Sequence, residues 1–123
     1  MRLLLDTHVV LWSRSSPNRL AARQRTAIAD QRNTVFVSSI SVAEIGIKSA
    51  LGKLKVTEGF ADSFEGFGLV ELPFTAAHAS RLTELPLHHR DPFDRMLICQ
   101  AIAEDLVFVT ADTRCAQYEV RTL

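Results

Sequence analysis

Short β-rich runs alternate with helical patterns along the whole chain, and this alternation constrains the fold most. Four runs have the apolar, β-branched or aromatic character of buried strands. They cover Arg2 to Leu5, Thr34 to Ser38, Leu69 to Leu72 and Leu106 to Thr110. Since strands separated by helices pair in parallel through right-handed crossovers, the pattern predicts an α/β fold. We expect a three-layer sandwich, with a parallel central sheet flanked by helices.

Capping residues, glycines and prolines set the limits of the expected helices. Ser39 and Ser41 offer N-caps for a helix that runs through Lys48 and ends near Gly52. Asp91 followed by a proline is a typical helix start. The other expected segments are helices over about Leu20–Asp30, Glu58–Phe67, Thr75–Leu85 and Asp91–Glu104, then a short helix and a final strand near Val120.

The length and composition indicate one globular domain over residues 1–123. The chain is long enough to bury a single core, and no linker or low-complexity stretch divides it. The net charge is zero, but residues 1–55 carry nine Lys or Arg against three acids, whereas residues 56–123 carry five Arg against eleven acids. This asymmetry is a weak indication of a surface for a polyanion.

The cysteines and the N-terminus indicate a cytoplasmic protein. Cys99 and Cys115 form no metal or redox motif, and Cys99 lies in an apolar helical run where a buried thiol is expected. The apolar N-terminus is interrupted by Asp6 and His8, and it is too short to cross a membrane. We therefore expect a reducing environment and no membrane association.

Four acidic residues fall at one edge of the expected sheet. Asp6 directly follows the first strand, and Asp112 follows the strand that ends at Thr110. Glu44 and Asp94 fall near the starts of two helices. Ligands of open parallel sheets bind at the carboxyl ends of the strands. Carboxylates gathered there repel one another unless cations bridge them, and an all-oxygen set favours Mg²⁺ or Mn²⁺ over zinc. Such a site suits metal-assisted displacement at phosphorus.

Each acid also has a purely structural interpretation. Asp6 and Asp91 can cap helices, and Asp112 can be a turn residue. Ser41 and Glu44 have the spacing of a capping box. A non-catalytic α/β protein-interaction module, with the acids acting as helix caps, therefore stays open as the alternative. The placement of all four acids at one end of the sheet favours the catalytic interpretation.

Four sequence blocks resemble the acidic motifs of the PIN-domain family. The blocks are LLLDTHVVLW, SSISVAEIGIKSALGKL, HHRDPFDRMLICQA and LVFVTAD. They are most similar to the VapC-type toxins of bacterial toxin–antitoxin pairs, in order and spacing over nearly the whole chain. The resemblance implies an endoribonuclease that uses Mg²⁺ or Mn²⁺ and leaves 3′-hydroxyl and 5′-phosphate ends. It also implies dimerisation and inhibition by a cognate antitoxin.

The resemblance assigns roles to individual residues. Asp6 and Asp94 would be the primary metal ligands, Glu44 would bind or orient the attacking water and could act as its base, and Asp112 would complete the shell or help to hold a second ion. The helper residues implied by the family are Thr7, Ser39 and Thr110. Asp91 is expected to cap its helix, with an outer-shell role open.

Several other residues are weaker candidates. Arg95 could pair with a carboxylate or contact phosphate because of its place beside Asp94. The aromatic stripe Phe60, Phe64 and Phe67 favours core packing, with a dimer or antitoxin groove as the alternative if it is exposed. His78, His88 and His89 show no metal-ligand spacing, and His8 has no expected role. The basic residues that could contact an RNA backbone are Arg14, Arg19, Arg23 and Arg25.

Two other classes of protein with an acidic active site fit the sequence poorly. A phosphoacceptor receiver domain needs adjacent acids after the first strand, where Asp6 is followed by Thr7, and a late lysine, whereas the last lysine is Lys55. A phosphatase with an aspartyl nucleophile needs an acid where His8 stands. No Gly-rich phosphate loop, serine hydrolase motif or zinc motif is present.

Overall fold

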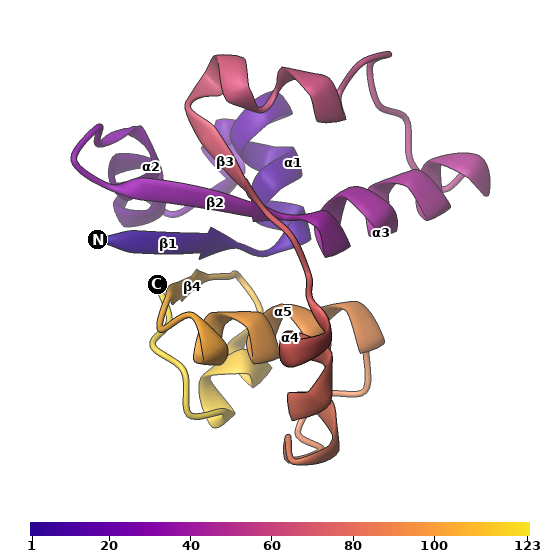
Figure 1. Ribbon diagram of the computed structural model, residues 1–123. Helices are drawn as coiled ribbons and strands as arrows, with labels where there is room; N and C mark the ends of the chain where they lie inside the picture. The colour runs from indigo at the N-terminus through magenta and orange to yellow at the C-terminus, as the bar shows by residue number, and fades with distance from the viewer.

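Four parallel strands form the central sheet in the computed structural model, which describes residues 1–123. Their order is β3-β2-β1-β4, so β1 lies between β2 and β4 (Figure 1). Leu4 of β1 pairs with Phe36 on one side and with Phe108 on the other. The strands are β1 (Arg2–Leu5), β2 (Thr34–Ser38), β3 (Leu69–Leu72) and β4 (Val107–Val109). The first three expected strands are confirmed residue for residue.

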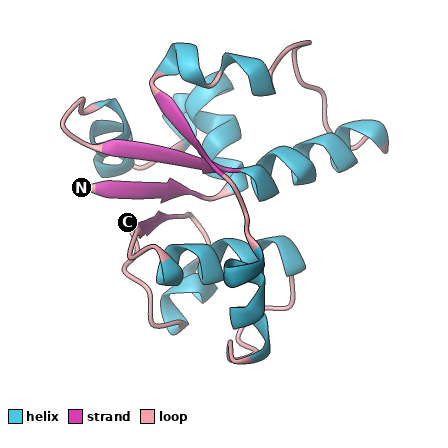
Figure 2. Cartoon of the chain, viewed as in Figure 1, coloured by secondary structure: helices cyan, strands magenta, loops and turns pink.

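Five α-helices connect and cover the strands (Figure 2). They are α1 (Thr7–Ser15), α2 (Ala22–Ala29), α3 (Ser39–Ala50), α4 (Ala76–Ser80) and α5 (Pro92–Ala103). Short 3₁₀ turns cover Pro17–Arg19, Ala61–Ser63, Glu65–Phe67, Arg81–Thr83 and Thr113–Gln117. No helix combines the length and the apolar character needed to span a bilayer.

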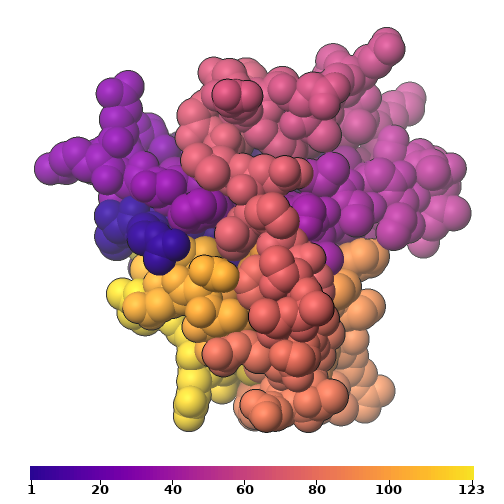
Figure 3. All heavy atoms as spheres, in the orientation of Figure 1, coloured from indigo at the N-terminus to yellow at the C-terminus, as the bar shows by residue number.

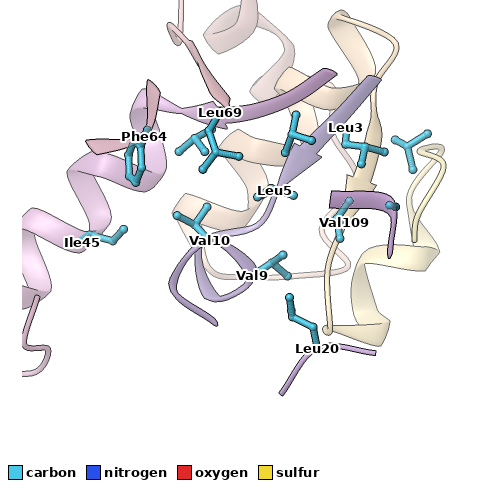
Figure 4. Close-up of a cluster of buried hydrophobic side chains, with 13 residues drawn as sticks. Leu3, Leu5, Val9, Val10, Leu20, Ile45, Phe64, Leu69 and Val109 are labelled. Atoms are coloured by element: carbon cyan, nitrogen blue, oxygen red, sulfur yellow. The ribbon is translucent and has the colours of Figure 1, made fainter. Parts of the chain in front are cut away.

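Both faces of the sheet are buried, which is why its strands are continuously apolar. Leu3 and Leu5 point to one face, where they pack with Val9, Val10 and Ile45 from the helices (Figure 4). Leu4 points to the opposite face and belongs to a second cluster. The other buried members of that cluster are Leu97, Ile98, Ala101, Leu106, Phe108, Cys115 and Tyr118. The expected three-layer α/β sandwich is therefore confirmed.

The connections place a topological switch at β1. The chain passes from β1 through α1 and α2 to the neighbouring β2, but it returns from β3 through α4 and α5 to the far side of β1. Ligand crevices of open α/β sheets lie at the carboxyl ends of the strands beside such a switch. The carboxyl ends of β1 and β4 meet at this point, where the Asp6 N–H donates to the Val109 carbonyl at 3.0 Å.

The N-terminal strand and the C-terminal segment lie side by side (Figure 3). Gln24 of α2 is buried and donates from Nε2 to the carbonyls of Thr110 and Leu123, at 3.1 and 3.0 Å. The expected final strand near Val120 is reduced to a single bridge between Phe108 and Thr122. The edge of the sheet beside β4 is thus covered by an irregular segment.

Several expected helices were wrong in kind or extent. The segment Glu58–Phe67 forms two 3₁₀ turns, because Gly59 and Gly68 take positive φ angles of 74° that end any regular helix. The helix expected from Thr75 to Leu85 stops at Ser80 and continues only as a 3₁₀ turn. Helix α1 was not among the expected helices, although Asp6 was recognised as a possible cap for a helix after the first strand.

Candidate active site

Asp6 and Asp112 are connected through one hydroxyl group at the ends of β1 and β4. Oγ1 of Thr110 donates to Oδ2 of Asp6 at 2.6 Å and accepts a hydrogen bond from the Asp112 backbone N–H at 3.0 Å. The other oxygen of Asp6 accepts from the backbone N–H of His8 at 2.8 Å and thereby caps α1. Asp6 is both a helix cap and a buried acid of the site.

Glu44 lies in the second turn of α3, which begins at Ser39 and therefore before either of the two starts that the sequence offered. Oγ of Ser38, not of Ser39 or Ser41, accepts from the N–H of Ile40 at 3.0 Å and caps the helix. The expected capping box between Ser41 and Glu44 is therefore wrong, and Glu44 is not engaged at a helix start.

The Glu44 carboxylate is buried, with only 3% of the residue exposed. Its Oε2 forms a 2.6 Å ion pair with Nζ of Lys48, one turn later on α3. Its Oε1 is buried and has no hydrogen-bond partner. Since buried polar atoms in folded proteins are almost always satisfied, the free oxygen is an acceptor that lacks its donor or cation.

Asp91 and Asp94 have different roles at the start of α5. Oδ1 of Asp91 accepts from the backbone N–H groups of Phe93 and Asp94, at 2.9 and 3.2 Å, which confirms Asp91 as the helix cap. The carboxylate of Asp94 caps nothing. Its Oδ2 lies 3.0 Å from Nε2 of His89.

His89 is a site residue that the sequence analysis missed. Nδ1 of His89 accepts a hydrogen bond from the Asp91 backbone N–H at 3.0 Å, so the ring proton resides on Nε2. Nε2 then lies 2.9 Å from Oδ2 of Asp112 and 3.0 Å from Oδ2 of Asp94. The buried imidazole therefore donates its hydrogen bond to Asp112 and lies in contact with the Asp94 carboxylate.

The loop that carries His89 is held by distant groups, which explains why spacing along the sequence did not reveal the residue. The Tyr118 hydroxyl accepts from the N–H groups of His88 and His89, at 3.1 and 2.8 Å. Arg95 donates to the carbonyls of Leu85, Pro86 and His89. The only sequence signal for His89 was its position two residues before the helix cap Asp91.

The structure also places two of the expected helper residues, Ser39 and Thr7, and the weaker candidate Arg95. Arg95 was expected to pair with a carboxylate or to contact phosphate, and its guanidinium holds the loop before α5. Oγ of Ser39 accepts from the backbone N–H of Phe74 at 2.9 Å and so fastens the segment after β3. Thr7 is buried and donates to Oγ of Ser41 at 2.9 Å, which ties the start of α1 to α3.

The acids of the site act on one another electrostatically. Burial and the negative charges of Asp6 and Asp91 raise the pKa of Asp94 to about 7, with a smaller contribution from Glu44. Burial also raises the pKa of Asp6, to which the charge of Glu44 adds, although the Thr110 hydrogen bond opposes the shift. The carboxyl groups of Asp6, Glu44 and Asp94 are therefore close enough for their charges to affect one another.

Asp112 differs from the other acids because a cation already neutralises it. Arg114 donates from Nε to Oδ1 and from Nη2 to Oδ2, at 3.1 and 2.9 Å. This fork holds the pKa of Asp112 well below its usual range. Asp112 also caps the 3₁₀ turn Thr113–Gln117 by accepting from the Arg114 backbone N–H.

A family model for the PIN domain matches residues 3–121. The chain belongs to the PIN domain family. No curated protein sequence matches it. PIN domains are generally nucleases, so the family agrees with a site of clustered acids at the carboxyl edge of the sheet.

Solved structures of low sequence identity share the fold of this PIN domain. VapBC2 from Rickettsia felis, bound to a promoter DNA fragment, has a TM-score of 0.75 at 20% identity and covers 100% of this chain and 98% of its own. DNA-bound VapBC from Salmonella typhimurium has a TM-score of 0.65 at 20% identity, with 100% and 97% covered. VapBC-1 from nontypeable Haemophilus influenzae has a TM-score of 0.66 at 16% identity, with 100% and 97% covered.

The donor atoms of this PIN domain fit a hard divalent cation. His89, Asp94 and Asp112 offer atoms that all lie within 4.8 Å of one another, but the proton on Nε2 makes His89 a donor rather than a ligand. The remaining groups are carboxylate oxygens, which Mg²⁺ and Mn²⁺ prefer. The unpartnered Oε1 of Glu44 and the raised pKa of Asp94 are what a site lacking positive charge is expected to display.

Proposed function

We propose that this PIN domain is a metal-dependent endoribonuclease, the toxin of a VapC-type toxin–antitoxin pair. The observation that carries the proposal is that one site contains both a buried oxygen of Glu44 without a hydrogen-bond partner and an aspartate, Asp94, whose pKa is raised. The carboxyl groups of Glu44 and Asp94 both lower the stability of the folded chain in this arrangement, and neither caps a helix. Groups kept at a cost to stability are characteristic of active sites.

Asp6, Glu44, Asp94 and Asp112 would hold Mg²⁺ or Mn²⁺, with Asp6 and Asp94 as the primary ligands. When bound, the cation supplies Lewis-acid activation of a phosphodiester and of water. The role of Asp91 is to start α5 and so to aim Asp94.

The protein's own groups prepare the site in three ways. Lys48 fixes Oε2 of Glu44 and leaves Oε1 free to accept a proton or a hydrogen bond from water. Thr110 and the His8 N–H immobilise Asp6. His89 donates to Asp112 and contacts Asp94. Carboxylates that are oriented in advance cost no rearrangement when substrate binds.

The competing proposal is a protein-interaction module whose acids serve only as caps. Asp6, Asp91 and Asp112 do cap helices, which favours that alternative for those three residues. Glu44 and Asp94 accept no backbone hydrogen bond in the structure and cap nothing. Because capping does not account for the buried Glu44 or the partly buried Asp94, we favour the nuclease.

The same proposal includes partners and a cellular setting. The similar solved structures carry the VapBC name, which supports a cognate antitoxin as inhibitor. We also propose RNA as the substrate and a homodimer as the assembly. Exposed apolar side chains, among them Phe67 at 64% and Leu51 at 63%, support protein contacts. We propose one nuclease domain over residues 1–123, acting in the cytoplasm.

The decisive experiment compares Asp94→Asn and Glu44→Gln with Asp62→Asn, which changes an exposed acid in the 3₁₀ turn Ala61–Ser63. Each purified chain is incubated with single-stranded RNA, with Mg²⁺, Mn²⁺ or EDTA. We expect cleavage by the wild type and by Asp62→Asn only with metal, and a loss of more than about 100-fold in the two site variants. Full cleavage by Asp94→Asn, or undiminished cleavage in EDTA, would refute the proposal.

A further inference from the structure

A groove of about 530 Å³ leads away from the acidic site between α1 and α3. At the site it is lined by Thr7 and Glu44, and further out by the segment Lys53–Thr57 that follows α3. In Figure 1, α1 follows the carboxyl end of β1 and α3 follows the carboxyl end of β2, so both helices begin at the edge of the sheet where the acids lie. The groove is therefore continuous with the place where the scissile phosphate is proposed to bind.

The charge of this groove is opposite to that of the site. Its only acid is Glu44, which is already paired with Lys48. Arg19, Lys53 and Lys55 also line it, are exposed and form no salt bridge. Three uncompensated cations beside a cluster of acids provide an attractive path for a polyanion that the acids alone would repel.

Planar side chains line the same groove. His8 and Trp12, one turn apart on α1, have ring centroids 5.7 Å apart. The guanidinium of Arg19 lies 4.6 Å from the Trp12 ring centroid. The two rings are tilted by 41°, and the three side chains of His8, Trp12 and Arg19 together form an array of planar groups beside the groove. Aromatic rings and guanidinium planes are the groups on which unpaired bases stack.

We propose that this groove binds the single-stranded RNA that flanks the scissile phosphate, with bases on the array of planar groups and phosphates on Lys53, Lys55 and Arg19. The inference rests on the proposed nuclease function for its position but adds a binding subsite with its own residues. An acidic polypeptide would satisfy the three cations but leave the array of planar groups unused. RNA satisfies both features, so the observations favour it.

The chain carries its own reporter for this subsite, because Trp12 is its only tryptophan. Binding is measured by Trp12 fluorescence in the full-length Asp94→Asn variant, so that RNA stays intact if the proposed function holds. We expect a single-stranded adenylate decamer to change the emission of Trp12. A poly-glutamate peptide and inorganic polyphosphate, which carry charge without bases, are the matched probes. A change with poly-glutamate but none with RNA would overturn the inference in favour of a protein ligand.

Charge variants test the phosphate contacts. Each contact with single-stranded nucleic acid contributes about −0.7 to the slope of log affinity against log salt concentration. Arg19→Gln, Lys53→Gln and Lys55→Gln should each reduce that slope by about 0.7, measured with fluorescently labelled RNA. Arg2→Gln is the matched control, since Arg2 is an exposed arginine at the amino end of β1 and outside the groove. Equal slopes in Lys53→Gln and Arg2→Gln would contradict the proposed path.

Stacking is tested at Trp12 itself. Trp12→Leu should weaken binding of the adenylate decamer by about 5-fold to 100-fold, whereas Trp12→Phe should restore most of it. Thermal unfolding of both variants separates lost stacking from lost packing, because Trp12 also packs on the core. Unchanged binding by a folded Trp12→Leu variant would exclude the stacking role.

The outcomes separate this inference from the proposed function. If the wild type cleaves RNA with metal but the groove variants bind and cleave normally, the subsite is wrong and the nuclease stands. If no metal supports cleavage but RNA still changes Trp12 emission with the predicted salt slopes, the nuclease is wrong and the subsite stands.

Discussion

Oγ1 of Thr110 donates a 2.6 Å hydrogen bond to Oδ2 of Asp6, although the two residues are 104 positions apart in the chain. The same oxygen accepts from the N–H of Asp112. One small side chain therefore determines how the first and the last acid of the site face each other. The hydrogen bond also favours the ionised form of Asp6, whose pKa burial would otherwise raise further.

Replacing Thr110 by the nearly isosteric Val should impair both stability and metal binding. A buried carboxylate oxygen on Asp6 would lose its donor, which costs about 1–3 kcal/mol in the free energy of unfolding. We expect Mn²⁺ affinity to fall about 10-fold to 100-fold, the effect of losing an outer-shell partner. Urea unfolding and calorimetric titration measure the two effects. Thr110→Ser, which keeps the hydroxyl, should retain both properties, and equal losses in Ser and Val would argue against the hydrogen bond.

His89 should be needed for stability and for metal affinity, even though it is not expected to bind the metal itself. His89→Leu removes the donor between Asp94 and Asp112, so their repulsion is no longer relieved. We expect lower stability of the metal-free chain and an approximately 10-fold to 100-fold loss of Mn²⁺ affinity. His89→Gln, which can place an N–H near the same position, should recover part of both. If Gln and Leu behave alike, the donor role of Nε2 is wrong.

Lys48 should compete with metal for Glu44. In Lys48→Met the Glu44 carboxylate is buried without a partner, so metal-free stability should fall by about 1–2 kcal/mol, the small value reflecting the partial exposure of Lys48. Mn²⁺ affinity should rise, because the charge of the Lys48 ammonium group no longer repels an ion beside Glu44. Melting temperatures with EDTA and with Mn²⁺ show both changes. Lys53→Met, which removes an unpaired lysine, serves as control, and a similar increase in affinity there would mean a general charge effect.

The raised pKa of Asp94 predicts a pH dependence of stability without metal. The folded chain keeps a proton on Asp94 up to about pH 7, whereas the unfolded chain releases it near the ordinary value of 3.8. Stability should therefore decline as pH rises through this window. Asp112, whose pKa is lowered, is ionised in both states there and contributes no slope.

Urea unfolding in EDTA at several pH values between about 4.5 and 7.5 tests this expectation. Asp94→Asn should flatten the decline, because an amide does not titrate. With saturating Mn²⁺, the stability of the wild type should instead rise with pH, since the metal binds the ionised carboxylate of Asp94. An identical decline in wild type and Asp94→Asn would assign the effect to other groups, such as Asp6, whose pKa is also raised.

The sequence predicted the sheet better than the helices, for a physical reason. Buried parallel strands are short apolar runs, so the limits of β1, β2 and β3 follow from composition alone. Helix α1 begins with the β-branched Thr7 and continues through two valines, and such residues locally favour a strand. The packing of α1 on the sheet overrides this preference. The helix expected at Glu58–Phe67 ignored Gly59, which takes a left-handed conformation.

Within the site, local patterns identified residues but not their partners. Asp91 was predicted as a cap, and its hydrogen bonds confirm it. His89 and Ser39 were misjudged, because their contacts depend on the long-range placement of Asp112 and Phe74. The metal-binding roles of the four acids remain predictions that the variants above test.

Under the proposed nuclease function, the pairing of β4 beside β1 has a consequence for the synthesis of the chain. Thr110 and Asp112 are added long after Asp6, and the strand that delivers them is the last of the sheet. Chains begin to fold from the N-terminal end while they are still being made. A partly translated chain thus lacks a complete set of acids while it is beside the ribosome's own RNA, and the proposed capacity to cut would arise only once β4 has been built.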